Sequence, residues 1–132
     1  MLIPCEIAVR SVIPALRAYV AKELTRSYDL KQTDVAKLLG ITQTAVSKYT
    51  RHVRGTVIHV EKIDEVQVIV KEICASLVSK DMPRNELVRQ FCTACRAIRQ
   101  KRLMCELCKR TDPTISIHEC VICISENSTC LP

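Results

Sequence analysis

Tryptophan is absent from this sequence, and phenylalanine, tyrosine and glycine are scarce, with one, three and two copies. A core with so few aromatic side chains must be aliphatic, and a hydrophobic content of 48% is ample for one. β-Sandwiches and barrels need many turns, for which two glycines and five prolines are too few. We find no run of eighteen apolar residues, so no membrane span is expected. The sequence therefore predicts an all-α protein.

Other absences narrow the function. The start of the chain lacks the basic and apolar regions of a signal peptide, so we expect a cytoplasmic protein. No Gly-rich nucleotide loop is present, and the three histidines have no obvious nucleophile beside them. We therefore expect no enzyme and no small-molecule substrate. The net charge is +6, and residues 1–54 hold nine Lys or Arg against four Asp or Glu. An excess of positive charge suits binding to a polyanion, although an ordinary solvated surface could carry the same charge.

Apolar periodicity predicts three longer helices. The first is capped near Ser11 and has Pro14 in its first turn. Its apolar positions recur over 15–28, and Lys22 lies on the side away from this apolar face. After a short extended piece at 55–60, the second, 61–80, has a wide apolar stripe that serves either the core or a dimer seam. The third follows Pro83, which ends the previous helix, and runs toward Leu103.

Two shorter helices are predicted between the first two. One covers Gln32 to Leu39, Gly40 provides the left-handed residue at its end, and Thr42 caps the next. In this second helix Ala45, Val46 and Tyr49 should face inward. Two short helices joined by a Gly-containing turn form a helix-turn-helix, whose second helix enters the major groove of DNA. An ordinary helical hairpin is the alternative.

The outward positions of this unit suit DNA contact. Gln43 can bind adenine, Thr44 and Ser47 can reach bases or phosphates, and the basic side chains would meet phosphates. The predicted DNA-binding residues are Gln32, Thr42, Gln43, Thr44, Ser47, Lys48, Arg51 and Arg54.

Nine cysteines remain the most distinctive feature. Cytoplasmic thiols stay reduced, which favours metal ligands over disulfides. Six of the nine form Cys-x-x-Cys pairs, and these are the candidate ligands: Cys92, Cys95, Cys105, Cys108, Cys120 and Cys123. Four thiolates hold one zinc ion or one cluster, so two of the six are surplus. The leading quartet is Cys92, Cys95, Cys120 and Cys123, followed closely by one that includes Cys105.

The remaining candidates are weaker. Cys5, Cys130 and His118 could be ligands, whereas Cys74 lies within an apolar stripe and should be buried. The pairs lack the glycine that usually follows a zinc knuckle, which favours an iron–sulfur cluster, [4Fe-4S] first, over zinc. Disulfides acting as a redox switch are a third possibility.

The segment from Leu30 onward resembles the XRE/Cro-type helix-turn-helix regulators. Their pattern of Leu-Thr-Gln, Leu-Ala, Leu-Gly-Val/Ile-Ser/Thr-Gln and Val/Ile-Ser appears here as Leu30-Lys31-Gln32, Val35-Ala36, Leu39-Gly40-Ile41-Thr42-Gln43 and Val46-Ser47. Lys31 departs from the usual capping Thr. The chain also resembles an archaeal subgroup that begins with Pro-Cys-Glu, here Pro4-Cys5-Glu6, and ends in a cysteine-rich tail.

Together these features predict a DNA-binding domain at 1–58 and a helical region at 59–132 for dimerisation and for binding the metal or cluster. The expected function is a homodimeric transcriptional regulator whose affinity for operator DNA changes with the iron–sulfur cluster. One alternative is a DNA-binding protein with a structural zinc or a partner-binding tail. Another, less favoured, is a thiol oxidoreductase, although no strand–helix–strand pattern precedes the pairs.

Overall fold

The computed structural model describes residues 3–52, 55 and 57–124. All regular elements within these residues are helical, as the scarcity of turn residues predicts. No helix in the described part of the chain is both long enough and apolar enough to cross a membrane. In chain order the elements are α1 (Pro4–Arg10), α2 (Val12–Ser27), α3 (Gln32–Leu39), α4 (Gln43–Thr50), the 3-10 helix η1 (Val60–Lys62), α5 (Asp64–Ser79), α6 (Arg84–Gln100) and α7 (Cys105–Thr111).

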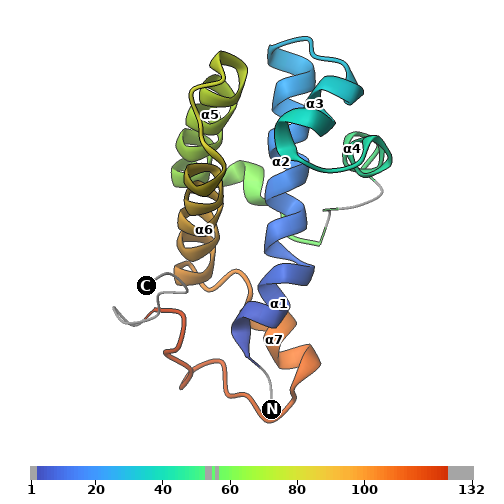
Figure 1. Cartoon of the computed structure of the whole chain (residues 1–132). Coiled ribbons are helices and arrows are strands. Elements are labelled where there is room, and N and C mark those ends of the chain that lie inside the picture. The colour runs from blue at the N-terminus through green and yellow to red at the C-terminus, as the bar shows by residue number, and fades with distance from the viewer. Residues whose placement is uncertain (1–2, 53–54, 56, 125–132) are drawn as a thin grey trace.

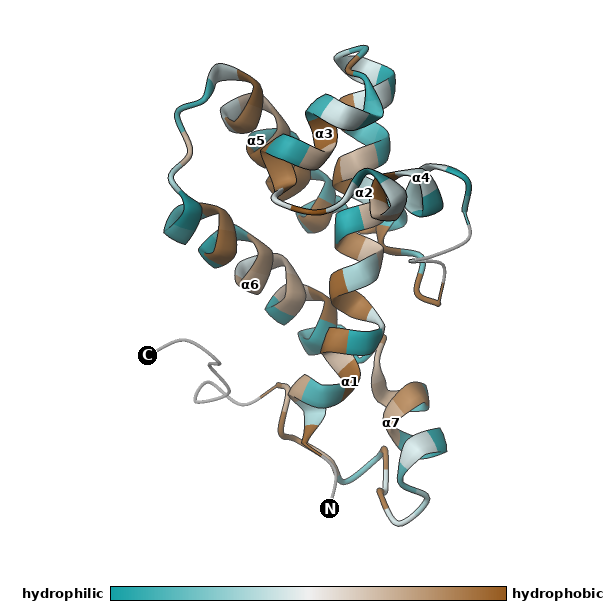
Figure 2. Ribbon diagram, turned by 45° about the vertical axis from the view of Figure 1, so that its right-hand side comes forward, coloured by the Kyte–Doolittle hydropathy of each residue, from teal (hydrophilic) through white to brown (hydrophobic). Residues whose placement is uncertain are grey.

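Helix α2 runs through the middle of the molecule (Figure 1). It packs against α4 on one side and against α5 and α6 on the other, while α1 and α7 lie together at one end. Hydrophobic positions recur along α2, α5 and α6 (Figure 2), and the buried ones form a single core cluster. This core draws on residues both before and after residue 58.

The aliphatic character of the core follows from the composition. Leu16, Val20 and Leu24 on α2 are fully or almost fully buried, as are Val70 and Ile73 on α5. Complete burial of each such side chain contributes about 1.5–3 kcal/mol. Much of the predicted apolar stripe of the helix after residue 60 therefore packs into the core. Val68 and Val78, however, remain 57% and 39% exposed on its outer side.

Lys22, placed by the sequence on the side of the helix away from its apolar face, is nevertheless buried. Lys22 is 8% exposed, and its Nζ lies 3.8 Å from a carboxylate oxygen of Glu61. Helices pack around α2 on more than one side, so even its polar face becomes covered. The ion pair with Glu61 offsets part of the cost of burying the ammonium group.

The five predicted helices are present with small shifts at their ends, and α1 is an additional helix that was not predicted. Helix α2 starts just after Ser11 with Pro14 in its first turn, and α3 has the predicted bounds. The 3-10 helix η1 lies where the helix from residue 61 was expected to begin, and α5 begins at Asp64. Helix α6 ends at Gln100 because Arg102 has a left-handed backbone, with φ at 61°. The helix α7 that follows was not predicted.

A substitution at Gly40 tests the turn between α3 and α4. Gly40 has φ at 65°, a conformation that costs L-residues about 1–2 kcal/mol. We expect Gly40→Ala to lower the free energy of unfolding by that amount in denaturant titrations. Gly40→Asn should lose less, because Asn tolerates this backbone better while carrying the same Cβ atom. Equal stability of the Ala variant and the original protein would contradict this account of the turn.

Candidate functional site

The first candidate site is the exposed side of α4. The Thr42 hydroxyl accepts a hydrogen bond from the Ala45 amide at 3.1 Å, which starts the helix as predicted. Val46 and Tyr49 are buried, and Ala45 is partly buried. The inward face of α4 is therefore fixed by packing against α2 and α3.

The polar side chains predicted to bind DNA occupy the other side of α4. Thr42, Gln43, Thr44 and Arg51 are exposed, while Ser47 and Lys48 are half-buried. The Arg51 Nε donates to the Ser47 carbonyl at 3.3 Å, so its guanidinium follows the end of the helix. Arg54 lies outside the described residues.

Gln32 has a structural partner that the sequence did not indicate. Its Nε2 donates to the Thr50 hydroxyl at 3.3 Å, which joins the start of α3 to the end of α4. This bond keeps the two helices in a fixed arrangement. A DNA phosphate would have to share the Gln32 side chain with Thr50.

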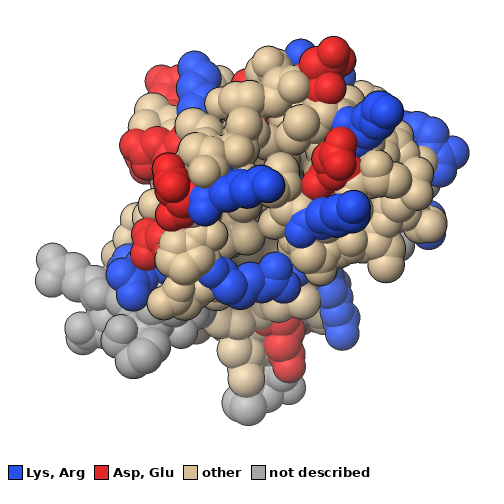
Figure 3. Space-filling view, turned by 45° about the horizontal axis from the view of Figure 1, so that its top comes forward, with Lys and Arg blue, Asp and Glu red and all other residues tan. Residues whose placement is uncertain are grey.

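Charges are unevenly distributed over the surface near α3 and α4. Lys and Arg side chains cross the middle and right of the view in Figure 3, the side on which Figure 1 shows α4. Acidic side chains gather mainly along the left edge, with a few among the basic ones. The positive charge is thus spread over this face.

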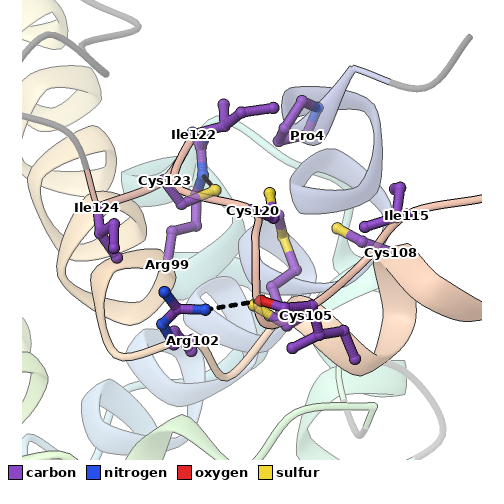
Figure 4. A pocket seen from close by; sticks show the side chains of 12 residues that line it. Pro4, Arg99, Arg102, Cys105, Cys108, Ile115, Cys120, Ile122, Cys123 and Ile124 are labelled. Carbon is purple, nitrogen blue, oxygen red and sulfur yellow. Dashed lines mark hydrogen bonds between the residues drawn. The ribbon is translucent and has the colours of Figure 1, made fainter.

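The second candidate site is a pocket at the opposite end of the molecule, which we call the cysteine pocket. Its volume is about 100 Å³, several times the roughly 10–15 Å³ that one water molecule needs. Cys105 and Cys108 from α7 line it together with Cys120 and Cys123 (Figure 4). The remaining lining is apolar apart from two arginines and consists of Pro4, Arg99, Arg102, Met104, Ile115, Ile117, Ile122 and Ile124.

Local hydrogen bonds bring the two cysteine pairs together. The Lys109 Nζ donates to the carbonyls of Pro113 and Ile115, each at 2.7 Å, which turns the chain back after α7. Arg102 donates to the Ile117 carbonyl at 2.9 Å (Figure 4). The Ile124 amide then bonds to the Val121 carbonyl at 3.3 Å, closing a turn that contains Cys123. The second pair therefore sits on a turn rather than on a helix.

The thiols of the cysteine pocket influence one another electrostatically. Burial raises the pKa of Cys108, and Cys123, Cys105 and Cys120 raise it further. Burial is also the main cause that raises the pKa of Cys105, while Arg102 opposes it. A bound metal cation would reverse this balance, because it stabilises thiolates directly.

The other candidate ligands are not among the residues that line this pocket. Cys92 lines a different pocket, beside Ile13, Leu39 and Phe91. Cys95 is 8% exposed and belongs to the hydrophobic core cluster. His118 is exposed and lines a separate shallow groove, and Cys130 lies outside the described residues. The described cysteines that line this pocket are thus Cys105, Cys108, Cys120 and Cys123.

The fit to a metal centre depends on how far the sulfurs must approach. Tetrahedral zinc with bonds of about 2.3 Å holds its sulfurs about 3.8 Å apart. Within the described part of the chain, no three Cys, His, Asp or Glu side chains are grouped closely enough to hold one metal ion. The donor set suits a thiolate-bound group, but a single ion would require the sulfurs to move together.

Arg99 and Met104 are parts of the pocket wall whose role the sequence did not identify. The Arg99 Nε donates to the Cys123 sulfur at 3.4 Å. Met104 is 2% exposed and lies just before α7. The concentration of basic residues after Cys95 was the available signal for Arg99, although it could not show which thiols the guanidinium meets.

Comparison of the chain with protein-family models, with curated proteins and with solved structures found no match.

Cys74 provides a test of the burial assignments. It is fully buried, its sulfur lies 3.9 Å from the Val20 carbonyl oxygen, and burial raises its pKa to about 12. Only thiolates react with alkylating agents, so we expect Cys74 to resist iodoacetamide at pH 8 in the native state and to react after unfolding. Peptide mass spectrometry measures both rates.

The same shift predicts a dependence of stability on pH. The folded state holds the Cys74 proton more tightly than the unfolded state, so stability should fall as pH rises from about 9 towards 12. Cys74→Ala should reduce this fall. Native alkylation of Cys74 as fast as that of half-buried Cys120 would contradict its placement in the core.

Proposed function

We propose that this protein is a DNA-binding transcriptional regulator whose affinity for DNA depends on a thiolate-bound iron–sulfur cluster, with [4Fe-4S] as the preferred type. The observation that carries the proposal is the meeting of two distant Cys-x-x-Cys pairs at one pocket, in a chain that also has the α3–α4 arrangement. Four thiols around one enclosed space are the donor set of such a cluster.

The DNA-binding half of the proposal rests on α3 and α4. Two eight-residue helices joined through a left-handed Gly40 have the form of a helix-turn-helix. Exposed Gln43 and Thr44 at the start of α4 suit base contacts, since recognition helices read bases with their N-terminal residues. A homodimer, as predicted from the sequence, would double these contacts at two half-sites.

The cofactor half rests on Cys105, Cys108, Cys120 and Cys123, which would hold the group. A bound iron–sulfur cluster supplies a redox-active centre whose potential responds to hydrogen bonds and solvent exposure. The arginines at the pocket favour an anionic thiolate centre. The space of about 100 Å³ is larger than a single zinc ion needs, which favours a cluster.

The link between the halves is structural. Helix α6 begins with Arg84, whose guanidinium lies against the position where Gly40 would carry a Cβ atom. The same helix carries Arg99 near its other end, about 22 Å away at 1.5 Å per residue. A change at the cysteine pocket can thus alter the α3–α4 turn if it shifts the balance between two positions of α6. A typical coupling free energy between two such sites is about 1–3 kcal/mol.

The DNA prediction is tested with duplexes selected from a random pool. We expect Lys48→Ala and Arg51→Ala to weaken binding to all sequences and to reduce the slope of log affinity against log salt by about 1 each. Gln43→Ala should cost about 1–3 kcal/mol on the selected sequence and relax its preference at one base pair. Arg110→Ala, exposed on the distant α7, is the matched control. Equal effects of Arg110 and Lys48 would indicate nonspecific attraction.

The cofactor prediction is tested by purifying the protein without oxygen and measuring iron, sulfide, zinc and visible absorbance. Replacement of any one of Cys105, Cys108, Cys120 and Cys123 by serine should remove most of the iron. Cys92→Ser should retain it, because Cys92 lines a different pocket. Loss of iron in Cys92→Ser with retention in Cys105→Ser would instead support the quartet Cys92, Cys95, Cys120 and Cys123. A colourless protein with zinc would support the structural alternative.

The regulatory prediction compares cluster-loaded and cluster-free protein in gel-shift assays on the selected duplex. Different affinities are expected, because α6 connects both sites. Equal affinities would remove the sensing role and leave a structural centre.

A further inference from the structure

One buried arginine contacts sulfur atoms from opposite ends of the chain. Arg99 is 6% exposed, and its Nε donates to the Cys123 sulfur at 3.4 Å. Its Nη1 donates to the Cys5 sulfur at 3.7 Å. Cys5 belongs to α1, whereas Cys123 belongs to the turn that completes the cysteine pocket. A single guanidinium therefore joins the first helix to the last described segment.

The position of α1 agrees with this connection. Pro4, the first residue of α1, lines the cysteine pocket, and α1 also packs against α7. The carboxylate of Glu6 accepts from the Ile3 amide at 3.3 Å, which fixes the first turn in which Cys5 lies. At the other end, the Ser11 hydroxyl donates to the Ile7 carbonyl at 2.6 Å in a buried setting. Cys5 is thus held at the pocket by a defined helix rather than by a loose terminus.

The chemistry of the contact depends on charge. A neutral thiol is a weak acceptor, whereas hydrogen bonds to charged groups are roughly twice as strong as neutral ones. A buried guanidinium is costly unless anionic or well-placed acceptors face it. Four thiolates around a metal centre would carry a net negative charge next to Arg99. The hydrogen bond from Arg99 to the Cys123 sulfur would then become stronger.

We propose that Cys5 is a fifth thiol of the cysteine pocket, that Arg99 is the residue that positions it, and that loading the pocket with a thiolate-bound centre fastens α1 to the site. This inference rests on the proposed function, since it needs the four-cysteine centre. It goes further by making the N-terminal helix part of that centre without assigning Cys5 as one of its four ligands.

The seven residues of α1 make the inference measurable. Isolated helices of fewer than about 12–15 residues are marginal in water, so α1 depends on its tertiary contacts. The backbone amides of Glu6 to Arg10 should therefore exchange hydrogen through local opening. Any added attachment of α1 lowers the frequency of that opening and slows exchange.

The experiment compares hydrogen exchange of the α1 peptide in protein reconstituted anaerobically with ferrous iron and sulfide and in the same protein stripped by chelator. Loading should slow exchange at least about tenfold, which corresponds to roughly 1.4 kcal/mol, because hydrogen bonds to charged groups contribute more than neutral ones. Cys5→Ser and Arg99→Lys should lose most of this slowing. Cys5→Ser should keep its iron, because the four ligands are unchanged.

Two matched controls separate this role from general disturbance of the pocket. Arg102→Lys alters an exposed arginine that also lines the pocket but donates to the Ile117 carbonyl instead of a sulfur, and it should keep the slowing. Cys92→Ser replaces a half-buried thiol away from the pocket and should keep it too. If Arg99→Lys fails to fold, Cys5→Ser alone carries the comparison.

The outcomes distinguish this inference from the proposed function. Iron uptake by the original protein with unchanged exchange in α1, or full slowing in Cys5→Ser, overturns the role of Cys5 and leaves the cluster site intact. Absence of bound iron and zinc in the original protein overturns the proposed centre itself, and the role of Cys5 with it. Slowing that is lost in Cys5→Ser and kept in both controls supports the inference.

Discussion

The Arg99 side chain is buried at the point where α6 ends and the cysteine-bearing segments meet. A guanidinium in that position must be surrounded by acceptors, because burying an uncompensated charge costs several kcal/mol. Its acceptors include the sulfurs of Cys123 and Cys5. The site is therefore arranged around a fixed cation, and the sulfur chemistry nearby is biased toward anionic thiolate ligands. The turns that position Cys120 and Cys123 bring the Cys123 sulfur within hydrogen-bond distance of this guanidinium.

The helix that carries Arg99 also connects the two ends of the molecule. Helix α6 extends from the Gly40 turn to the cysteine pocket, and α2 packs against both α4 and α6. Helix α1 leads directly into α2 at Ser11. Two helical paths therefore connect the region of the pocket with α4, one along α6 and one along α1 and α2.

Much of the helical structure could be predicted because it follows local rules. Gly40 ends α3 with a left-handed backbone, Thr42 caps α4, and Pro14 lies in the first turn of α2, all from residue chemistry alone. Lys22 could not be placed, because its burial depends on the helices packed around α2 and on the partner Glu61. Helix α7 was missed because seven residues contain too few turns to reveal a period.

The choice of cysteines shows most clearly what spacing can and cannot predict. Cys-x-x-Cys pairs on two helices look alike, since a step of three puts both thiols on one face in either case. What separates them is the direction of that face. Leu87, Ala94 and Ile98 form the buried stripe of α6, and Cys95 lies beside it at 8% exposure. The pair on α7 has no comparable stripe and turns toward Cys120 and Cys123 instead.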